Sequence, residues 1–158
     1  MIKISFEVTD APARLTVTEH MLYPLDTVWL VQTEALYVQR WWAPAEYENV
    51  DIELTTEVGG PWRVLQRDPQ GNQFSLYGKV VDVVPQERLV ISITTELFPD
   101  TTIRLHQQFL GRDGGTSVVS TYLFDAEEDL SSYLDLGGIE RLRGASARLA
   151  ALLAQIAS

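Results

Sequence analysis

The chain has 158 residues, of which 46% are hydrophobic and 22% charged, and this size and balance are typical of one globular domain with a sizeable core. It contains no cysteine, which excludes disulfides, cysteine metal sites and thiol chemistry. The formal net charge of -10, from 22 acidic and 12 basic residues, repels nucleic acid and anionic membrane surfaces on average, so we expect neither as a partner.

The first predicted element is a strand over residues 2–9. Large apolar residues stand at every second position from Ile2 to Val8, which gives the segment one face to bury and one to expose. Residues 10–12 permit a tight reversal, so we expect this strand to pair with the next one. The added strand leaves a new sheet edge, through which we expect a homodimer to form.

The same segment lacks the apolar block and the cleavage site of a signal peptide. No later apolar run approaches the length needed to span a bilayer. We therefore expect a cytoplasmic protein that does not insert into membranes.

The second predicted strand covers residues 13–22. Its residues alternate between two faces, one of which carries Leu15, Val17 and Glu19. A helical stretch then opens at Pro24. We expect it to form two short helices that break near residue 33.

The helical stretch ends in a pair of tryptophans, Trp41 and Trp42, followed by Pro44, which discourages continuation. Neighbours on a helix point about 100° apart. One tryptophan is therefore expected to fill the core, and the other to cap the surface or line a cavity mouth.

The middle of the chain reads as a run of strands separated by turns, which predicts an antiparallel meander. The predicted strands cover residues 50–58, 62–67, 74–84, 88–95, 103–110 and 116–124.

Three glycines in this region have structural interpretations. No GxxxxGK[ST] or GxGxxG motif occurs, so Gly59 and Gly60 indicate a bulge or a sharp strand entry and not a phosphate site. Gly78 stands in the middle of a predicted strand, which indicates a tight bend or the close approach of another group.

The C-terminal segment predicts one long helix over about residues 138–157. Apolar residues at spacings of three and four give it one face to bury, and the meander offers the only large apolar partner. They are Leu142, Ala145, Leu149, Leu152, Leu153 and Ile156. The acidic run from Asp125 to Asp129 is expected to be a solvated loop whose carboxylates favour the positive N-terminus of this helix. A calcium site is the alternative, although the spacing matches no EF-hand loop.

These elements resemble the bacterial branch of the family named after the activator of the Hsp90 ATPase, within the START-like, SRPBCC or polyketide cyclase superfamily. Four stretches carry the resemblance: Tyr23-Pro-Leu-Asp-Thr-Val-Trp29, Tyr37-Val-Gln-Arg-Trp-Trp-Ala-Pro44, Val58-Gly-Gly-Pro-Trp-Arg63 and Gly78-Lys-Val-Val-Asp-Val-Val-Pro-Gln-Glu-Arg-Leu89. The resemblance covers residues 13–157 of a single domain spanning 1–158, with residues 1–12 as an additional strand. One departure is Gly137-Gly-Ile139, where the family often has a glycine–tryptophan pair.

The resemblance implies an α+β helix-grip fold. A curved antiparallel sheet of six or seven strands should surround the long C-terminal helix, with two short helices after the first strand. An internal cavity between sheet and helix would bind a small hydrophobic ligand, lipid-like or polyketide-like, without a cofactor. We expect the lining to include Trp41, Trp62, Phe74, Leu76, Leu105, Phe109, Tyr122 and Leu149.

Two alternatives follow from the same resemblance. The first is an enzyme that cyclises or dehydrates a substrate in the cavity. The sequence contains no G-x-S-x-G or S-x-x-K motif and no histidine at metal-ligand spacing, so we assign no catalytic or metal-binding residue. Acid–base candidates are limited to Tyr77, Tyr122, Glu57 and His106. The second alternative is a co-chaperone that stimulates an Hsp90 ATPase, with the chaperone as partner.

Overall fold

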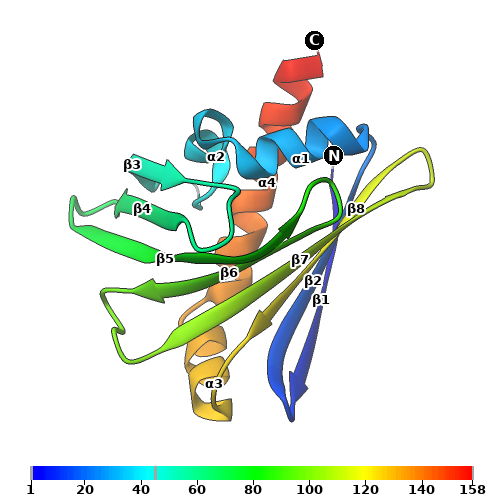
Figure 1. The fold of residues 1–158 in the computed structure, drawn as a ribbon. Coiled ribbons are helices and arrows are strands. Elements are labelled where there is room, and N and C mark those ends of the chain that lie inside the picture. Colours follow the sequence, from blue (N-terminus) through cyan, green and yellow to red (C-terminus); the bar gives the residue numbers. More distant parts are fainter. Residues whose placement is uncertain (1, 45, 158) are drawn as a thin grey trace.

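A curved antiparallel sheet carries the long helix α4 across one of its faces (Figure 1). The computed structural model describes residues 2–44 and 46–157. In chain order the elements are β1 (Lys3–Asp10), β2 (Ala13–Met21), α1 (Leu25–Thr33), α2 (Ala35–Trp41), β3 (Glu48–Leu54), β4 (Pro61–Arg67), β5 (Gln73–Val84), β6 (Arg88–Thr95), β7 (Thr102–Arg112), β8 (Gly115–Leu123), α3 (Glu127–Asp135) and α4 (Gly138–Ala157). None of these helices is both long and apolar enough to cross a membrane.

The strand order is β1-β2-β8-β7-β6-β5-β4-β3. Strands β3 to β8 form the predicted meander. The β1–β2 hairpin extends this sheet through antiparallel pairing of β2 with β8. All eight predicted strands enter this one sheet, so it has eight strands instead of six or seven. The predicted α+β helix-grip architecture is confirmed.

The N-terminal strand pairs with its sequence neighbour, as predicted. The register places Phe6 opposite Val17 and Ile4 opposite Glu19. Ile4 and Phe6 pack against a small core formed by residues of β2, β8 and α3. Burial of this apolar face explains why β1 is an ordered edge strand and not a loose tail.

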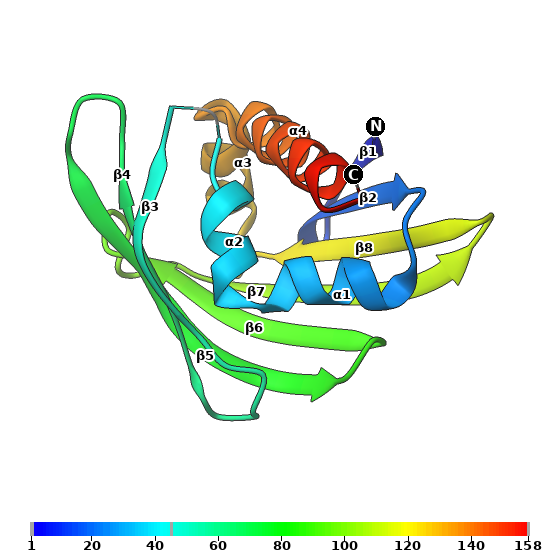
Figure 2. The ribbon, with the colours of Figure 1, turned by 90° about the horizontal axis from the view of Figure 1, so that it is seen from above.

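The two short helices are also confirmed, with their break at Glu34. This residue has extended backbone angles (φ -85°, ψ 124°) and separates α1 from α2. Viewed from above, both helices and α4 lie on the concave side of the sheet (Figure 2).

The prediction of a loop over the acidic run was wrong, because residues 127–135 form helix α3. Glu127, Glu128 and Asp129 occupy its first turn, where negative charge interacts favourably with the positive end of the helix dipole. Leu130 is buried in the small core beside β2. A single buried anchor in nine residues gives too weak an apolar period to predict a helix from sequence.

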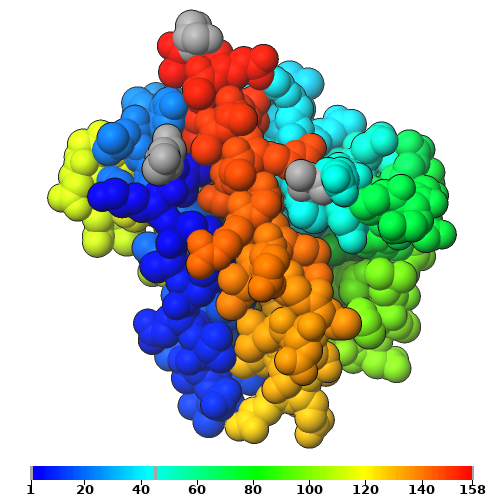
Figure 3. Space-filling view, turned by 180° about the vertical axis from the view of Figure 1, so that it is seen from behind, coloured from blue at the N-terminus to red at the C-terminus, as the bar shows by residue number. Residues whose placement is uncertain are grey.

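Two cores fill the concave face. At the α1 end, Val28, Val31, Leu149 and Leu153 are fully buried in the larger core. The α3 end holds the smaller core, in which Leu15 and Leu130 are buried. Seen from behind, α4 and α3 run down the molecule with β1 on one side and the α2–β3 segment on the other (Figure 3).

Candidate ligand-binding cavity

A cavity of about 560 Å³ opens at the α3 end, between the concave face of the sheet and the helices. Its walls come from the inward faces of β2 and β4 to β8, from α3, from the N-terminal half of α4 and from the segment joining α2 to β3. Its volume lies within the range typical of small-molecule sites, about 300–1,000 Å³.

The walls are mainly aromatic and aliphatic. The aromatic lining residues are Trp41, Trp42, Tyr47, Phe74, Phe98, Tyr122, Phe124 and Tyr133. At the mouth, Leu97, Phe98 and Leu136 are 58%, 53% and 58% exposed. The apolar surface therefore continues from the interior to the outside of the molecule.

Five of the eight residues expected to contact a ligand line this cavity. They are Trp41, Phe74, Leu76, Leu105 and Tyr122.

The other three, Trp62, Phe109 and Leu149, are buried in the larger core and do not line the cavity. The ring of Trp42 packs edge-on against Trp62, with 5.0 Å between centroids. Helix α1 places Trp29 edge-on against Phe109 at 4.9 Å. These three positions face inward as the strand and helix periods predict, but neighbouring side chains fill the space beside them.

Trp41 is buried in the larger core and Trp42 is partly buried, and both also line the cavity. Helix α2 ends at Trp41, and Trp42 has left the helical conformation (φ -77°, ψ 54°). The angle of about 100° between helical neighbours therefore does not apply to this pair. The indole Nε1 of Trp41 donates to the Val31 carbonyl at 2.8 Å, which fixes its ring.

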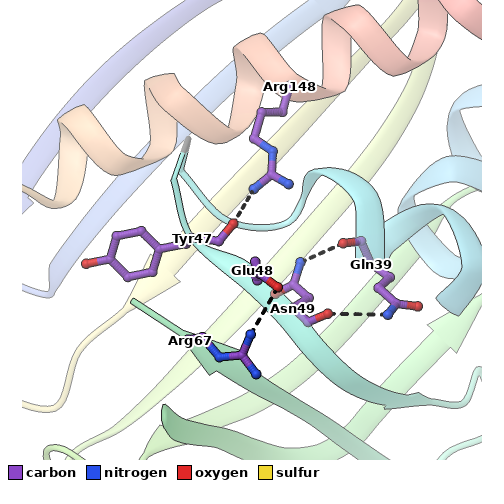
Figure 4. A network of polar contacts seen from close by, with 6 residues as sticks. All are labelled: Gln39, Tyr47, Glu48, Asn49, Arg67 and Arg148. Carbon is purple, nitrogen blue, oxygen red and sulfur yellow. Dashed lines mark hydrogen bonds and ion pairs between the residues drawn. The ribbon is translucent and has the colours of Figure 1, made fainter. Parts of the chain in front are cut away.

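The wall formed by residues 42–44 and 47 is held to α4 by polar contacts, and β3 beside it is held to α2 (Figure 4). Arg148 of α4 donates from Nη1 to the carbonyls of Ala43, Pro44 and Tyr47 at 2.9, 3.1 and 3.3 Å. The side chain of Asn49 donates to the Gln39 carbonyl at 3.0 Å. The bonds from Arg148 tie the wall to α4, and the bond from Asn49 ties β3 to α2.

Glu19 places a carboxyl group in the cavity wall. It lies on the inward face of β2, opposite Ile4 of β1, and its Oε2 accepts a hydrogen bond from the Ser146 hydroxyl of α4 at 2.8 Å. Burial raises the pKa of Glu19 above its usual value, and the bond from Ser146 opposes this only in part. The alternation from Leu15 to Glu19 places this carboxyl on the apolar face of the strand, which is the sequence signal that marks it as a candidate site residue.

Further polar groups lie near Glu19 on the inward faces of β7 and β8. Gln107 donates from Nε2 to the Ser120 hydroxyl at 3.2 Å. The Tyr122 hydroxyl has no hydrogen-bond partner within residues 2–44 and 46–157, and no fully buried side-chain polar atom there is left unpaired. The Tyr122 hydroxyl is therefore open to the cavity. Burial, with smaller effects of Tyr133 and Glu19, raises the pKa of Tyr122.

The other acid–base candidates lie outside the cavity. Glu57 and Tyr77 are exposed, with Tyr77 retaining 41% of its surface. His106 alternates with Leu105 and Gln107, so it falls on the outer face of β7, beside Arg14 and Arg88. Burial and the neighbouring Arg104 lower the pKa of His106, while Asp82 acts in the opposite direction.

The raised pKa of Glu19 predicts that Glu19→Gln changes the pH dependence of stability. Above pH 4.5, the ordinary pKa of a glutamate side chain, the unfolded chain releases the proton while the folded chain still holds it. The wild type therefore loses stability as pH rises through this window, and the loss levels off above the folded pKa. Glutamine carries no charge at any pH. We expect the free energy of unfolding of Glu19→Gln, relative to wild type, to increase from pH 4 to pH 8 in urea titrations. A difference that is constant with pH would contradict the raised pKa.

Comparisons with known proteins agree with this architecture. The family described as Activator of Hsp90 ATPase homolog 1-like protein matches residues 22–154. A structure of a Rhodobacter sphaeroides protein is 19% identical, with a TM-score of 0.87 over 98% of this chain and 99% of that one. A protein of Mycobacterium smegmatis is 21% identical, with a TM-score of 0.85 over 96% and 97% of the two chains.

The AHSA1 protein of Silicibacter pomeroyi is 16% identical, with a TM-score of 0.76 over 90% of this chain and 99% of that one. At such identities the structures show a shared fold and not a shared activity. A comparison with curated proteins finds no match. Since the family match covers most of the sequence and every layer of the fold except the β1–β2 hairpin, the chain belongs to the Activator of Hsp90 ATPase homolog 1-like family, within the START-like superfamily.

Proposed function

We propose that the protein binds a small, mainly apolar molecule in the cavity at the α3 end. The observation that carries this proposal is the volume of about 560 Å³ enclosed by aromatic and aliphatic side chains. Apolar walls with a few convergent polar groups are the usual composition of ligand sites. The exposed side chains of Leu97, Phe98 and Leu136 offer an apolar path at the mouth.

The proposal can be tested by placing a large side chain on α4 so that it occupies the cavity. Ala145 is half-buried and lines the cavity, whereas Ala147 on the same helix is exposed. We expect N-phenyl-1-naphthylamine, a neutral fluorescent probe, to bind the wild type and the control Ala147→Trp equally. Ala145→Trp should weaken its binding at least tenfold, about 1.4 kcal/mol, because the indole occupies the same space.

The measurement is a fluorescence titration, with circular dichroism spectra to check that both variants fold. Equal affinity in the two tryptophan variants would place the probe elsewhere. No binding to the wild type by any neutral apolar probe would remove the proposal.

The family description names a second candidate, stimulation of an Hsp90 ATPase. We rank it second because such an activator acts through contacts with the chaperone, whereas the main feature of this chain is an internal cavity. The ATPase rate of the chaperone from the same organism, measured with and without this protein, tests it directly.

A further inference from the structure

Three charged side chains line the cavity among the described residues, and they come from different elements. Glu19 lies in β2, Asp129 lies in α3 and Arg141 lies near the start of α4. Arg141 already has partners, since its guanidinium sits 5.6 Å from the centre of the Tyr133 ring and donates to the Leu136 carbonyl. Asp129 is 3.5 Å from the Thr101 hydroxyl.

Glu19 has no cationic partner within residues 2–44 and 46–157. The ion pairs there join arginines to carboxylates on the outer surface: Arg63 with Asp51, Arg67 with Glu48 and Arg88 with Asp82.

The groups that face Glu19 from the neighbouring elements do not neutralise it. Strand β1 contributes the apolar Ile4, and α4 contributes the Ser146 hydroxyl. Tyr122 and Tyr133 are the titratable groups on the side of β8 and α3, and burial raises the pKa of both, that of Tyr133 to about 12. Arg143 of α4 is exposed and stacks on the ring of Phe6 at 4.8 Å.

A carboxyl group in this setting favours a positively charged ligand. A buried carboxylate without a counter-ion is costly, and a cation beside it removes much of that cost. The faces of aromatic rings also attract cations, and rings of Trp41, Trp42 and Tyr122 line the cavity. The net charge of -10 draws cations toward the protein and repels anions.

We propose that the cavity selects a hydrophobic amine, with its protonated nitrogen beside Glu19 and its apolar body between the aromatic walls, which include Tyr122. This inference rests on the proposed function, since it names the class of ligand for the same cavity. Ser146 holds the carboxyl in place through Oε2, and the second oxygen remains to accept a hydrogen bond from the ammonium group.

The experiment compares three ligands that share one chain and differ in the head group: decylamine, decanol and decanoate. Isothermal titration calorimetry at pH 7.5, below the micelle concentrations, gives the three dissociation constants. We expect decylamine to bind wild type at least tenfold more tightly than decanol, and decanoate to bind most weakly.

Glu19→Gln should weaken decylamine binding about 30-fold or more, the effect of removing one partner of a buried charge pair. Its affinity for decanol should change less than threefold, because an amide still accepts a hydrogen bond. The control Glu53→Gln removes the same charge from an exposed position on β3 and should leave all three affinities unchanged.

A pH series on the wild type gives a readout that needs no variant. Decylamine should bind more weakly as pH falls and Glu19 takes up its proton, while decanol binding stays constant. Equal affinities for decylamine and decanol, or decylamine binding unaffected by Glu19→Gln, would overturn the inference while leaving the proposed function intact. If none of the three ligands binds while N-phenyl-1-naphthylamine does, the inference fails and the proposed function stands. If neither they nor the probe bind, the proposed function fails as well.

Discussion

Replacing Gly78 by alanine is expected to destabilise the protein by about 3 kcal/mol or more, at the upper end of the effects of overpacking. A Cβ atom at this position would lie 1.6 Å from the Ser92 carbonyl oxygen and 2.6 Å from its carbon. Both atoms belong to the backbone of β6, so no side-chain rotation can relieve the contact. The β5–β6 ladder, in which Gly78 faces Ile93, would have to separate.

Gly111→Ala is the matched control, because a Cβ atom there meets nothing within 4 Å. Gly111 also lies in a strand of the same sheet. Urea unfolding of the two variants and the wild type checks the prediction. Equal stability of Gly78→Ala and Gly111→Ala would show that the sheet accommodates the extra atom without cost.

The same substitution should also affect the cavity. Phe74 and Leu76 line the cavity from β5, within four residues of Gly78. The close approach of Gly78 to the Ser92 backbone fixes the position of β5 relative to β6. It therefore also fixes the positions of the Phe74 and Leu76 side chains. The sequence correctly indicated a tight bend or close approach at this glycine, but only the structure identifies Ser92 as the group that comes close.

The fold could be predicted in most parts because its elements carry strong local patterns. Strict alternation predicted β1 and its pairing with β2, and the apolar period of three and four predicted α4 over residues 138–157. Helix α3 was missed because its stability depends on Leu130 and Tyr133 packing against distant strands. Such tertiary contacts leave little trace in a nine-residue segment.

The site could be predicted less well, for a different reason. The periods of strands and helices show which side chains face inward, but not which of them border empty space. Phe109 and Leu105 face the same way on β7, yet α1 covers Phe109 and leaves Leu105 beside the cavity. For Glu19 the sequence shows a carboxyl on an otherwise apolar strand face. Only the structure shows that this face borders a cavity.

Arg148→Met is expected to lower the free energy of unfolding by about 2 kcal/mol, because hydrogen bonds from a charged donor are among the stronger ones and their loss leaves carbonyl groups unpaired. The guanidinium of Arg148 donates hydrogen bonds to the carbonyls of Ala43, Pro44 and Tyr47. All three residues line the cavity. Methionine keeps much of the apolar stem of the side chain but donates no hydrogen bond.

The same change should weaken binding of the neutral probe N-phenyl-1-naphthylamine, since the wall that contacts it is no longer tied to α4. Arg148→Lys should recover only part of both losses, because an ammonium group lacks the planar fork of the guanidinium. Arg143→Met is the control on the same helix: it removes one exposed contact with the Phe6 ring, worth about 0.5–1 kcal/mol, and lies outside the cavity lining. Urea unfolding and probe titration of the three variants separate the effects. If Arg148→Met and Arg143→Met behave alike in both measurements, the carbonyl contacts of Arg148 do not hold the cavity wall.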